Sequence, residues 1–517
     1  MSKRSPHTPR QTVVQKWPLL QSRLRMLLPR AWRGAVATRC GMNALACTLM
    51  ALLVACGGGD SLTAGGVGSG GTGLAEGTVT GLGSVIVDGQ TYVETDAAVV
   101  TEDAAGSAGN TAVKLGQRVR VSYSTSGTAD VASRIEVVPQ LFGPVTAVAD
   151  ALGVFQVMGQ TVALLDGASS RQAVLAGISQ LNGLAVGDWV EVHGSWTRTT
   201  SGRYRLVASR VEKRDAASTV GSAVLLSGVV HARTAQTTGA RWRLNADNGL
   251  LLSAASVPAA MVNGSLVRVW LPASALGQVP AVADRVALAD LTALAPAGTP
   301  LRFGAQAADY NRSTRTLQVQ GVSLQLPTDV QLDETALSNG GYVTVQLSRS
   351  GEQWQVLSGT VQAGGTSLQR DIELRGVVSG VDFSTDPVSW SMRGIAVQAS
   401  RSVIDDRCLS AGSTDVYMQV TGRLTGREAV VASQVQCPLQ QAPTGATVER
   451  RGQVLSVDTT TRTLVLQTLH PGQGVRISAQ WDANSYFPIS PDTLPGLTVE
   501  IEGIQNGSQL RIRRVRM

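Results

Sequence analysis

The chain has 517 residues, enough for several hydrophobic cores. Only 16% of the residues are charged and 4% are aromatic, while 56 are glycine, and this turn-rich composition favours an all-β protein. Nine of the 44 lysines and arginines, and none of the 37 acidic residues, precede Cys56, so the formal net charge of +7 becomes −2 (35 basic against 37 acidic residues) from Cys56 onwards. This balance argues against a nucleic-acid-binding protein, because no basic excess remains to contact phosphates.

The N-terminal segment has the pattern of an export signal. A region rich in arginine and lysine precedes an apolar run over residues 42–55. This run is too short to cross a bilayer comfortably, so the pattern predicts a signal peptide over residues 1–55 and not a permanent transmembrane helix. Met1 and Met26 both remain possible start positions.

The apolar run ends in Leu53-Val54-Ala55-Cys56, which resembles the lipobox of bacterial lipoproteins. The resemblance implies that Cys56 is acylated and holds the protein stably at a membrane. The next residue is Gly57 and not aspartate, which by the same resemblance implies an outer-membrane lipoprotein facing the periplasm or the cell surface. Residues 56–74, rich in glycine, serine and threonine, are expected to form a flexible tether.

From residue 75 onwards one strand pattern, with alternating aliphatic and variable residues, returns six times. Its copies begin at Arg118, Trp189, Leu266, Tyr342, Tyr417 and Thr498. Upstream of each copy lies a strand that in most cases begins with glycine, followed in several units by a hairpin such as Val85–Val93, whose Asp-Gly turn is typical of tight β-hairpins. Each unit therefore holds about five strands.

Five short strands can close into a small Greek-key barrel of the OB type, whereas a lone hairpin is only marginally stable. We therefore expect an all-β protein: a tandem array of about six five-stranded OB-like barrels behind the signal peptide and the tether. The expected barrels span residues 75–138, 140–215, 222–290, 297–362, 372–438 and 447–517.

The repeat resembles a bacterial family known only as a domain of unknown function, numbered five-six-six-six. The matching features are the glycine-led strand, the Val-Asp-Gly hairpin, the segment Leu-Ala-Val-Gly-Asp-Trp-Val-Glu-Val-His-Gly over residues 184–194, and the ending Ala-Ser-Arg-Val-Glu. The resemblance is good for the first two units, fair for the fifth and sixth, and weak for the third and fourth. It brings no catalytic residues.

Cys408 and Cys437 are the two cysteines that remain after Cys56, an even pair in an exported chain. A disulfide between them is expected, and two buried free thiols are the alternative. The third and fifth strands of an OB-like barrel run parallel and end at the same rim. Cys408 is expected in the loop after the third strand of unit five, and Cys437 at the end of its fifth strand.

The sequence offers no catalytic constellation. His193, His231 and His470 fall in three different units without ligand-spaced partners, so we interpret them as surface or strand-end residues and expect neither a metal site nor a cofactor. The outward positions Trp189, Tyr342 and Tyr417 could stack sugars or bases, or could pack one barrel against the next.

Two functions remain. The first is a non-enzymatic, lipid-anchored scaffold of the cell envelope that contacts other envelope proteins. The alternative is a module that binds an envelope glycan or another ligand through aromatic residues on the barrel faces.

Overall fold

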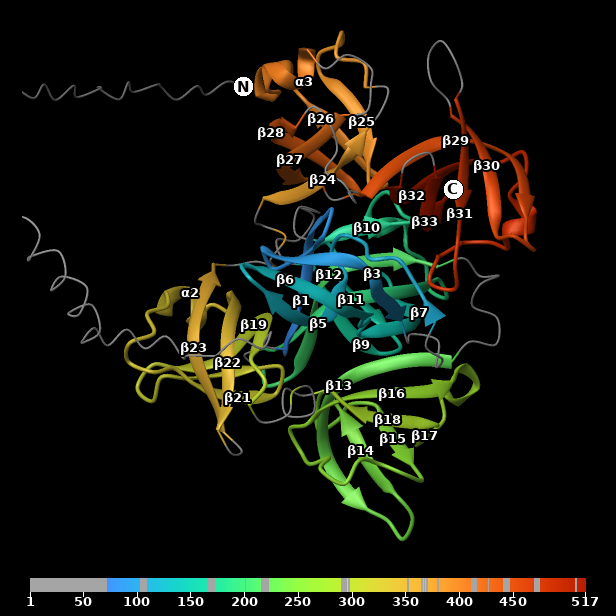
Figure 1. Cartoon of the computed structure of the whole chain (residues 1–517). Coiled ribbons are helices and arrows are strands. Elements are labelled where there is room, and N and C mark those ends of the chain that lie inside the picture. Colours follow the sequence, from blue (N-terminus) through green and yellow to red (C-terminus); the bar gives the residue numbers. More distant parts are fainter. Residues whose placement is uncertain are drawn as a thin grey trace, which may run out of the picture. The chain divides into compact units, whose positions relative to one another are not determined.

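The computed structural model describes residues 72–517 except for 103–108, 165–172, 200, 215–222, 290–294, 296–297, 351–352, 364–365, 367, 369–370, 379–380, 411–415, 426, 440–446, 469–474 and 507–508. The predicted signal peptide, Cys56 and nearly all of the predicted tether lie outside the described residues. The described residues are mostly β-strand (Figure 1) and belong to one compact unit. Within them, no helix has the length and apolar character needed to cross a membrane.

Group 1 is a closed five-stranded barrel (Figure 1). Its strands are β1 (Thr72–Leu82), β2 (Val85–Val87), β3 (Gln90–Glu102), β5 (Arg118–Ser126) and β6 (Ala129–Val137), with the short β4 (Gly109–Asn110) beside β3. Antiparallel pairs join β1 to β2, β2 to β3, β5 to β6 and β1 to β5, and a parallel pair joins β3 to β6. This is the strand order expected from the sequence.

Group 2 is a second closed barrel with the same order of pairings. It contains β7 (Leu141–Ala147), β8 (Val154–Val157), β9 (Gln160–Ala163), β10 (Val174–Ala176), β11 (Trp189–Arg198) and β12 (Tyr204–Lys213), with the short 3-10 helix η2 (Leu181–Gly183) before β11. The ring closes through the parallel pair of β9 and β12, and β10 continues this parallel pairing along β12.

Group 3 follows the same plan with an interrupted fifth strand. Its elements are β13 (Ala223–Ala235), β14 (Ala240–Leu244), β15 (Leu251–Ala254), β16 (Leu266–Pro272), η4 (Ala273–Ala275), β17 (Ala281–Val282) and β18 (Arg285–Leu288). The position of the fifth strand is divided, because β17 pairs with β15 and β18 pairs with β16.

Groups 4 and 6 repeat the ring of pairings of the first two groups. Group 4 contains β19 (Leu301–Asn311), β20 (Thr316–Val319), β21 (Val322–Gln325), α2 (Glu334–Ser338), β22 (Tyr342–Ser350) and β23 (Gln353–Gln362). Group 6 contains β29 (Thr447–Asp458), β30 (Thr463–Thr468), β31 (Arg476–Gln480), η7 (Pro491–Thr493), β32 (Thr498–Asn506) and β33 (Gln509–Arg516).

Group 5 has five strands and one short helix. Its elements are β24 (Ile372–Val378), β25 (Val388–Met392), β26 (Ile395–Ala399), η6 (Arg401–Val403), α3 (Asp406–Ser410), β27 (Val416–Leu424) and β28 (Ala429–Leu439). Pairings connect β24, β27, β28, β26 and β25 in that order. Among the described residues no pairing joins β24 to β25, so this group is not a closed ring.

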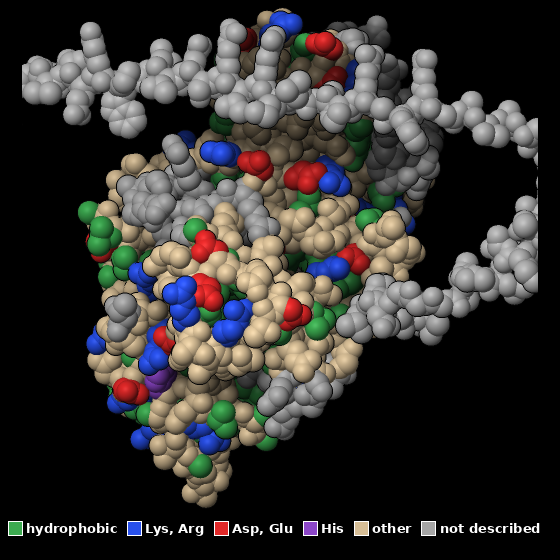
Figure 2. All heavy atoms as spheres, turned by 90° about the vertical axis from the view of Figure 1, so that its left-hand side faces the viewer, with side chains coloured by type: hydrophobic (Ala, Val, Ile, Leu, Met, Phe, Trp, Pro, Cys, Tyr) green, Lys and Arg blue, Asp and Glu red, His purple; other side chains and the backbone are tan. Residues whose placement is uncertain are grey.

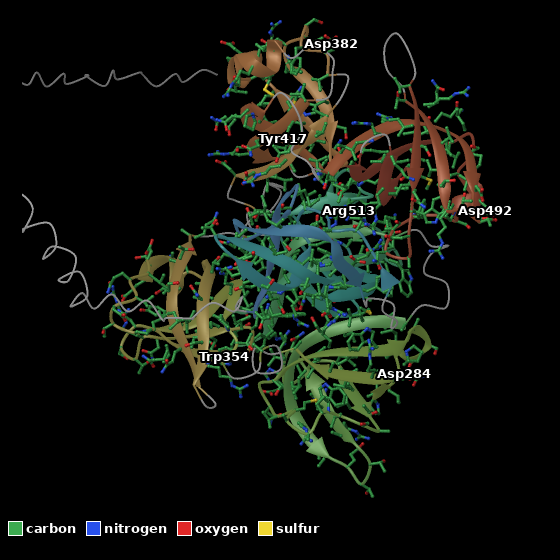
Figure 3. The ribbon with its side chains drawn as sticks, in the orientation of Figure 1. Asp284, Trp354, Asp382, Tyr417, Asp492 and Arg513 are labelled. Carbon is green, nitrogen blue, oxygen red and sulfur yellow. A yellow bond between two sulfur atoms is a disulfide. The ribbon has the colours of Figure 1, made fainter. Side chains whose placement is uncertain are left out.

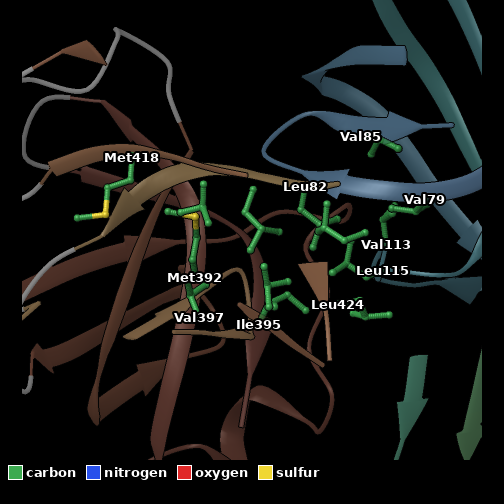
Figure 4. Packing of buried hydrophobic residues seen from close by; sticks show 14 of the residues in the cluster. Val79, Leu82, Val85, Val113, Leu115, Met392, Ile395, Val397, Met418 and Leu424 are labelled. Atoms are coloured by element: carbon green, nitrogen blue, oxygen red, sulfur yellow. The ribbon is translucent and has the colours of Figure 1, made fainter. Parts of the chain in front are cut away.

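The groups are joined to one another, a feature that the predicted tandem array of barrels did not specify. Short parallel pairings join β1 to β19, β1 to β24 and β24 to β29, so the backbone hydrogen bonding crosses the expected borders. The interior is continuous as well. Buried residues of groups 1 and 5 form one hydrophobic cluster, with Leu82 from the first group and Ile395 from the fifth (Figure 4), and groups 2 and 3 share another.

The exposed surface carries charges of both signs. On the face shown in Figure 2, lysine and arginine side chains lie among aspartate and glutamate side chains. Figure 3 labels Asp284 in group 3 and Asp492 in group 6, both of which are exposed. This mixture agrees with the near-zero net charge of the chain after residue 55.

Candidate functional site

One contact recurs between a first-strand glycine and the hairpin turn that follows it. In group 1, a Cβ atom placed on Gly77 would lie 1.9 Å from Oδ2 of Asp88, so only glycine leaves room for the carboxylate. Asp88 has a φ of 51° and Gly89 a φ of 85°, as a tight hairpin turn requires. We call the space above this glycine the glycine notch.

The same notch receives a turn side chain in three other groups. Each of these turn residues has a positive φ, between 50° and 65°. The pairs are Gly143 with Met158, Gly228 with Asn245, and Gly376 with Arg393. In these four groups the glycine of the first strand therefore has a packing role, because it admits the side chain of its own hairpin.

In group 1 this turn side chain also reaches group 4. The Tyr342 hydroxyl donates hydrogen bonds to the Asp88 carboxylate, at 2.9 Å from Oδ1 and 3.1 Å from Oδ2. A Cβ atom on Gly304 of group 4 would also lie 1.9 Å from Asp88 Oδ2, so one carboxylate occupies two glycine notches. Burial, together with the nearby charge of Asp88, raises the pKa of Tyr342 far above its usual value, so the phenol stays protonated.

In group 5 the turn side chain reaches group 6. The backbone N–H of Arg393 donates to Glu449 Oε2 at 2.7 Å, and its guanidinium Nη1 bonds to Glu502 Oε1. Glu502 also accepts from Arg514 at 3.2 Å and from Arg516 at 2.7 Å. The side chains of Arg393, Glu449, Glu502, Arg514 and Arg516 are all almost completely buried or half-buried, so they form a charge network at the interface between groups 5 and 6. We call each such interface between two groups a joint.

The two carboxylates of this joint have opposite pKa shifts. Burial raises the pKa of Glu449 to about 7, even though Arg393 and Arg516 lie near it. Burial acts on Glu502 in the same direction, but Arg393, Arg514 and Arg516 outweigh it and hold the pKa of Glu502 far below its usual value. Glu449 and Glu502 lie directly opposite each other on β29 and β32.

A small polar cavity borders this network. Ser84 and Glu94 of group 1, Arg393 of group 5, and Glu502, Arg514 and Arg516 of group 6 are among the residues that line it. Arg513 of group 6, labelled in Figure 3, places Nη1 at 3.9 Å from Glu94 Oε2. Groups 1, 5 and 6 thus meet at one set of charged side chains.

A second charged joint lies between groups 1 and 2. His193 is fully buried, with Nε2 at 2.7 Å from Glu191 Oε1, and its Nδ1 accepts a hydrogen bond of 3.3 Å from the backbone N–H of Arg118. Burial lowers the pKa of His193, so the ring is neutral at pH 7 and carries its proton on Nε2. The expectation of a surface or strand-end histidine was therefore wrong for His193.

Two buried arginines complete the joints. Arg118 bonds to Glu76 at 2.9 Å and donates to the carbonyl oxygen of Gly304 in group 4. Arg210 of group 2 bonds to Glu428 of group 5 at 2.7 Å and to the carbonyl oxygen of Leu115 in group 1. A buried charge without a partner destabilises a protein by several kcal/mol. The packing of the groups over Arg118 and Arg210 therefore depends on these hydrogen bonds and ion pairs.

The three aromatic candidates lie at contacts between groups and not in one open row. Trp189 is half-buried and packs edge-on against Phe142, with ring centres 5.4 Å apart, in a cluster that includes Leu225 and Trp270 of group 3. Tyr342 is buried in the joint with group 1. Tyr417, labelled in Figure 3, is half-buried against the core of group 6. All three side chains thus pack between groups, which is one of the two interpretations that the sequence left open.

The two cysteines of group 5 form a disulfide, as the sequence predicted. Cys408 in α3 and Cys437 in β28 are bonded and buried, with Cα atoms 5.3 Å apart. Cys56, the predicted lipidation site, and His470 lie outside the described residues. Among the residues that the structure describes, no three His, Cys, Asp or Glu side chains gather as metal ligands would.

Sequence reasoning missed the residues that form the joints, chiefly Asp88, His193, Arg393, Glu449 and Glu502. The position of Asp88 and Arg393 before a glycine marks a hairpin turn, and this is the signal that could have identified them. The buried glutamates carry no local signal, because their partners lie on other strands or in other groups.

The comparison with known families agrees with the strand groups. Residues 142–212 match the model of the family Domain of unknown function (DUF5666). This range coincides with the closed barrel of group 2, whose strands run from Leu141 to Lys213. No curated protein matches the chain.

Proposed function

We propose that the chain is a lipid-anchored scaffold of the cell envelope built from six tandem repeats of one barrel; the family match over residues 142–212 supports the barrel as the repeated unit. The repeats have the borders expected from the sequence, and groups 3 and 5 are diverged copies. The role is non-enzymatic: the scaffold holds a folded surface at the membrane for contacts with other envelope components.

The non-enzymatic role is supported chiefly by one observation: buried arginines bond to residues of neighbouring groups. Arg118, Arg210 and Arg393 each bond across a joint between groups, and each is almost completely buried. An active site keeps some of its charged groups open to a substrate. These three arginines instead form hydrogen bonds and ion pairs with residues of other groups, which supports a structural role.

The proposed membrane attachment rests on the sequence alone. The resemblance of residues 53–56 to a lipobox, behind a basic and then apolar leader, supports acylation of Cys56. The glycine-rich segment that follows would let the barrels stand away from the bilayer. The outer membrane is the proposed location, on the strength of Gly57.

A cysteine substitution tests the attachment. Membrane and soluble fractions are compared for the native protein, for Cys56→Ala and for the control Cys47→Ala, which changes a leader cysteine outside the lipobox. We expect the native protein and the control in the membrane fraction, with Cys56→Ala lost from it or left unprocessed. Mass spectrometry should find an acylated Cys56 at the mature N-terminus, and an intact leader or an unmodified start would refute the anchor.

A further inference from the structure

The outer face of β13 and β14 in group 3 gathers cationic side chains. Arg241 and Arg243 are two positions apart on β14, so they share a face and stand about 7 Å apart along the strand. Trp242 between them points into the core and is fully buried. Arg243 lies directly opposite His231 on β13, and Arg241 lies opposite Thr234.

Two other charged residues, Arg233 and Asp247, lie close to this face in the sequence or in space. Arg233 lies in the irregular stretch of β13 between His231 and Thr234. Asp247 bonds to His231 at 3.3 Å, and its own side chain is 92% exposed. The third expected barrel, residues 222–290, contains five arginines against three aspartates. This excess differs from the chain after residue 55, where acidic residues slightly outnumber basic ones.

Two side-chain nitrogens on or beside this face have no hydrogen-bond partner among the described residues. The Nε2 atom of His231 and the Nε atom of Arg233 are buried and accept or donate no hydrogen bond within the described residues. No described carboxylate forms an ion pair with Arg233, Arg241 or Arg243, whereas the arginines of the joints between groups are paired. Arg243 donates from Nη1 to the carbonyl oxygen of Gly249 at 2.9 Å, and the exposed Arg241 is left to pair with an anion from outside the chain.

The chemistry of the face favours sugar over nucleic acid. Guanidinium groups bind carboxylates and phosphates through paired hydrogen bonds. The hydroxyl groups of Thr234 and Ser253 lie opposite Arg241 on the two neighbouring strands, where they can bond to sugar hydroxyls. Single-stranded nucleic acid needs aromatic rings for stacking. The aromatic residues beside this face do not offer them, because Trp242 is buried and Tyr204 packs edge-on against His231.

We infer that the face formed by His231, Arg241 and Arg243 binds an acidic polysaccharide. The face is called the arginine face below. The inference deepens the proposed scaffold function by naming a class of partner, and it differs from the aromatic glycan site considered from the sequence. Binding is measured in solution, so its failure would leave the lipid anchor untouched, and failure of the anchor would leave the arginine face untouched.

Fluorescence anisotropy with labelled polygalacturonate tests the arginine face. The native protein should bind this probe, and binding should weaken as salt is raised because exposed charges are screened. Arg241→Glu with Arg243→Glu should weaken binding at least about tenfold, since two charge-assisted contacts are lost. The control, Arg423→Glu with Arg427→Glu in group 5, changes the net charge equally and should bind within about twofold of the native protein.

Three results would overturn the inference: no binding of polygalacturonate to the native protein at low salt, equal weakening by both double variants, or tighter binding of a single-stranded oligothymidine than of polygalacturonate. Labelled dextran, an uncharged polysaccharide, tests whether binding depends on the negative charge of the probe, and it should not bind. Thermal unfolding checks that each variant folds. If the glutamate pair fails this check, Arg241→Gln with Arg243→Gln takes its place, with the same expected direction.

Discussion

The Tyr342 hydroxyl donates to the Asp88 carboxylate across 254 positions of the sequence, and both residues are buried. Asp88 stands in the hairpin turn of group 1, and Tyr342 begins β22 of group 4. The Asp88 side chain that fills the glycine notch of group 1 therefore also holds group 1 against group 4. This hydrogen bond also explains why a position that alternation places on the outside of a barrel carries a tyrosine.

Replacing Tyr342 by phenylalanine should destabilise the protein by about 1–3 kcal/mol, because the buried Asp88 carboxylate loses a donor. Urea denaturation measures this change. The control is Tyr417→Phe, which removes a hydroxyl that donates to no other described residue and should change the stability by less than about 0.5 kcal/mol. An equal effect of the two substitutions would show that the Asp88 bond contributes nothing specific.

Glu449 should make stability depend on pH in an unusual direction. Its folded-state pKa of about 7 lies above the ordinary value of 4.5, so the folded protein holds this proton more tightly than the unfolded chain does. The stabilisation is therefore complete below about pH 4.5 and is lost as the pH rises through about 7. The total is on the order of 3 kcal/mol.

Glu449→Gln isolates this contribution, because glutamine keeps the shape and an acceptor oxygen but does not titrate. The stability of the variant relative to the native protein should rise between pH 4.5 and pH 8. Urea denaturation at a series of pH values gives this difference directly. A difference that is constant with pH, or that falls, would contradict the raised pKa.

His193 should be neutral at pH 7 with its proton on Nε2. Burial lowers its pKa, Glu191 accepts from Nε2, and the Arg118 N–H donates to Nδ1. Nitrogen-15 NMR of the imidazole distinguishes this tautomer from the imidazolium ion. Because the folded-state pKa lies below the ordinary value, the associated stability is present above about pH 6.5 and is lost as the pH falls through the lower folded value. Imidazolium signals from His193 at pH 7 would disprove this assignment.

The disulfide should stabilise group 5. Cys408 and Cys437 are 29 positions apart, and closing a loop of that length contributes about 3–4 kcal/mol in the chain-entropy model. Reductant should therefore lower the unfolding temperature of the native protein. The variant with both cysteines replaced by alanine should already unfold at the lower temperature and show no response to reductant. A native protein that ignores reductant under unfolding conditions would argue against this contribution.

The strands were predictable because alternation of aliphatic residues is a local signal. Val119 and Val121 point into the core of group 1, as the pattern around Arg118 indicated. The Asp88-Gly89 turn was also predicted, because this pair adopts the positive φ values that a tight hairpin needs.

The burial of the outward positions was not predictable from the same pattern. Arg118 and Glu191 occupy outward positions on their strands, yet both are almost completely buried. Alternation identifies which face of a strand lines its own barrel, but it cannot reveal that another group covers the opposite face. Besides Glu76 of its own group, Arg118 bonds to the carbonyl oxygen of Gly304, which is 186 positions away. Such contacts depend on tertiary packing and leave no mark in the local sequence.

Hydrogen exchange of Asp88→Ala tests most directly whether hairpin-turn side chains fasten the groups to one another. In the native protein the Asp88 carboxylate lies against Gly77 and Gly304 and accepts from Tyr342. The substitution should increase amide exchange in β22 of group 4 as well as in group 1, and should leave the strands of group 3 unchanged. Faster exchange confined to group 1, with β22 as protected as in the native protein, would contradict this account.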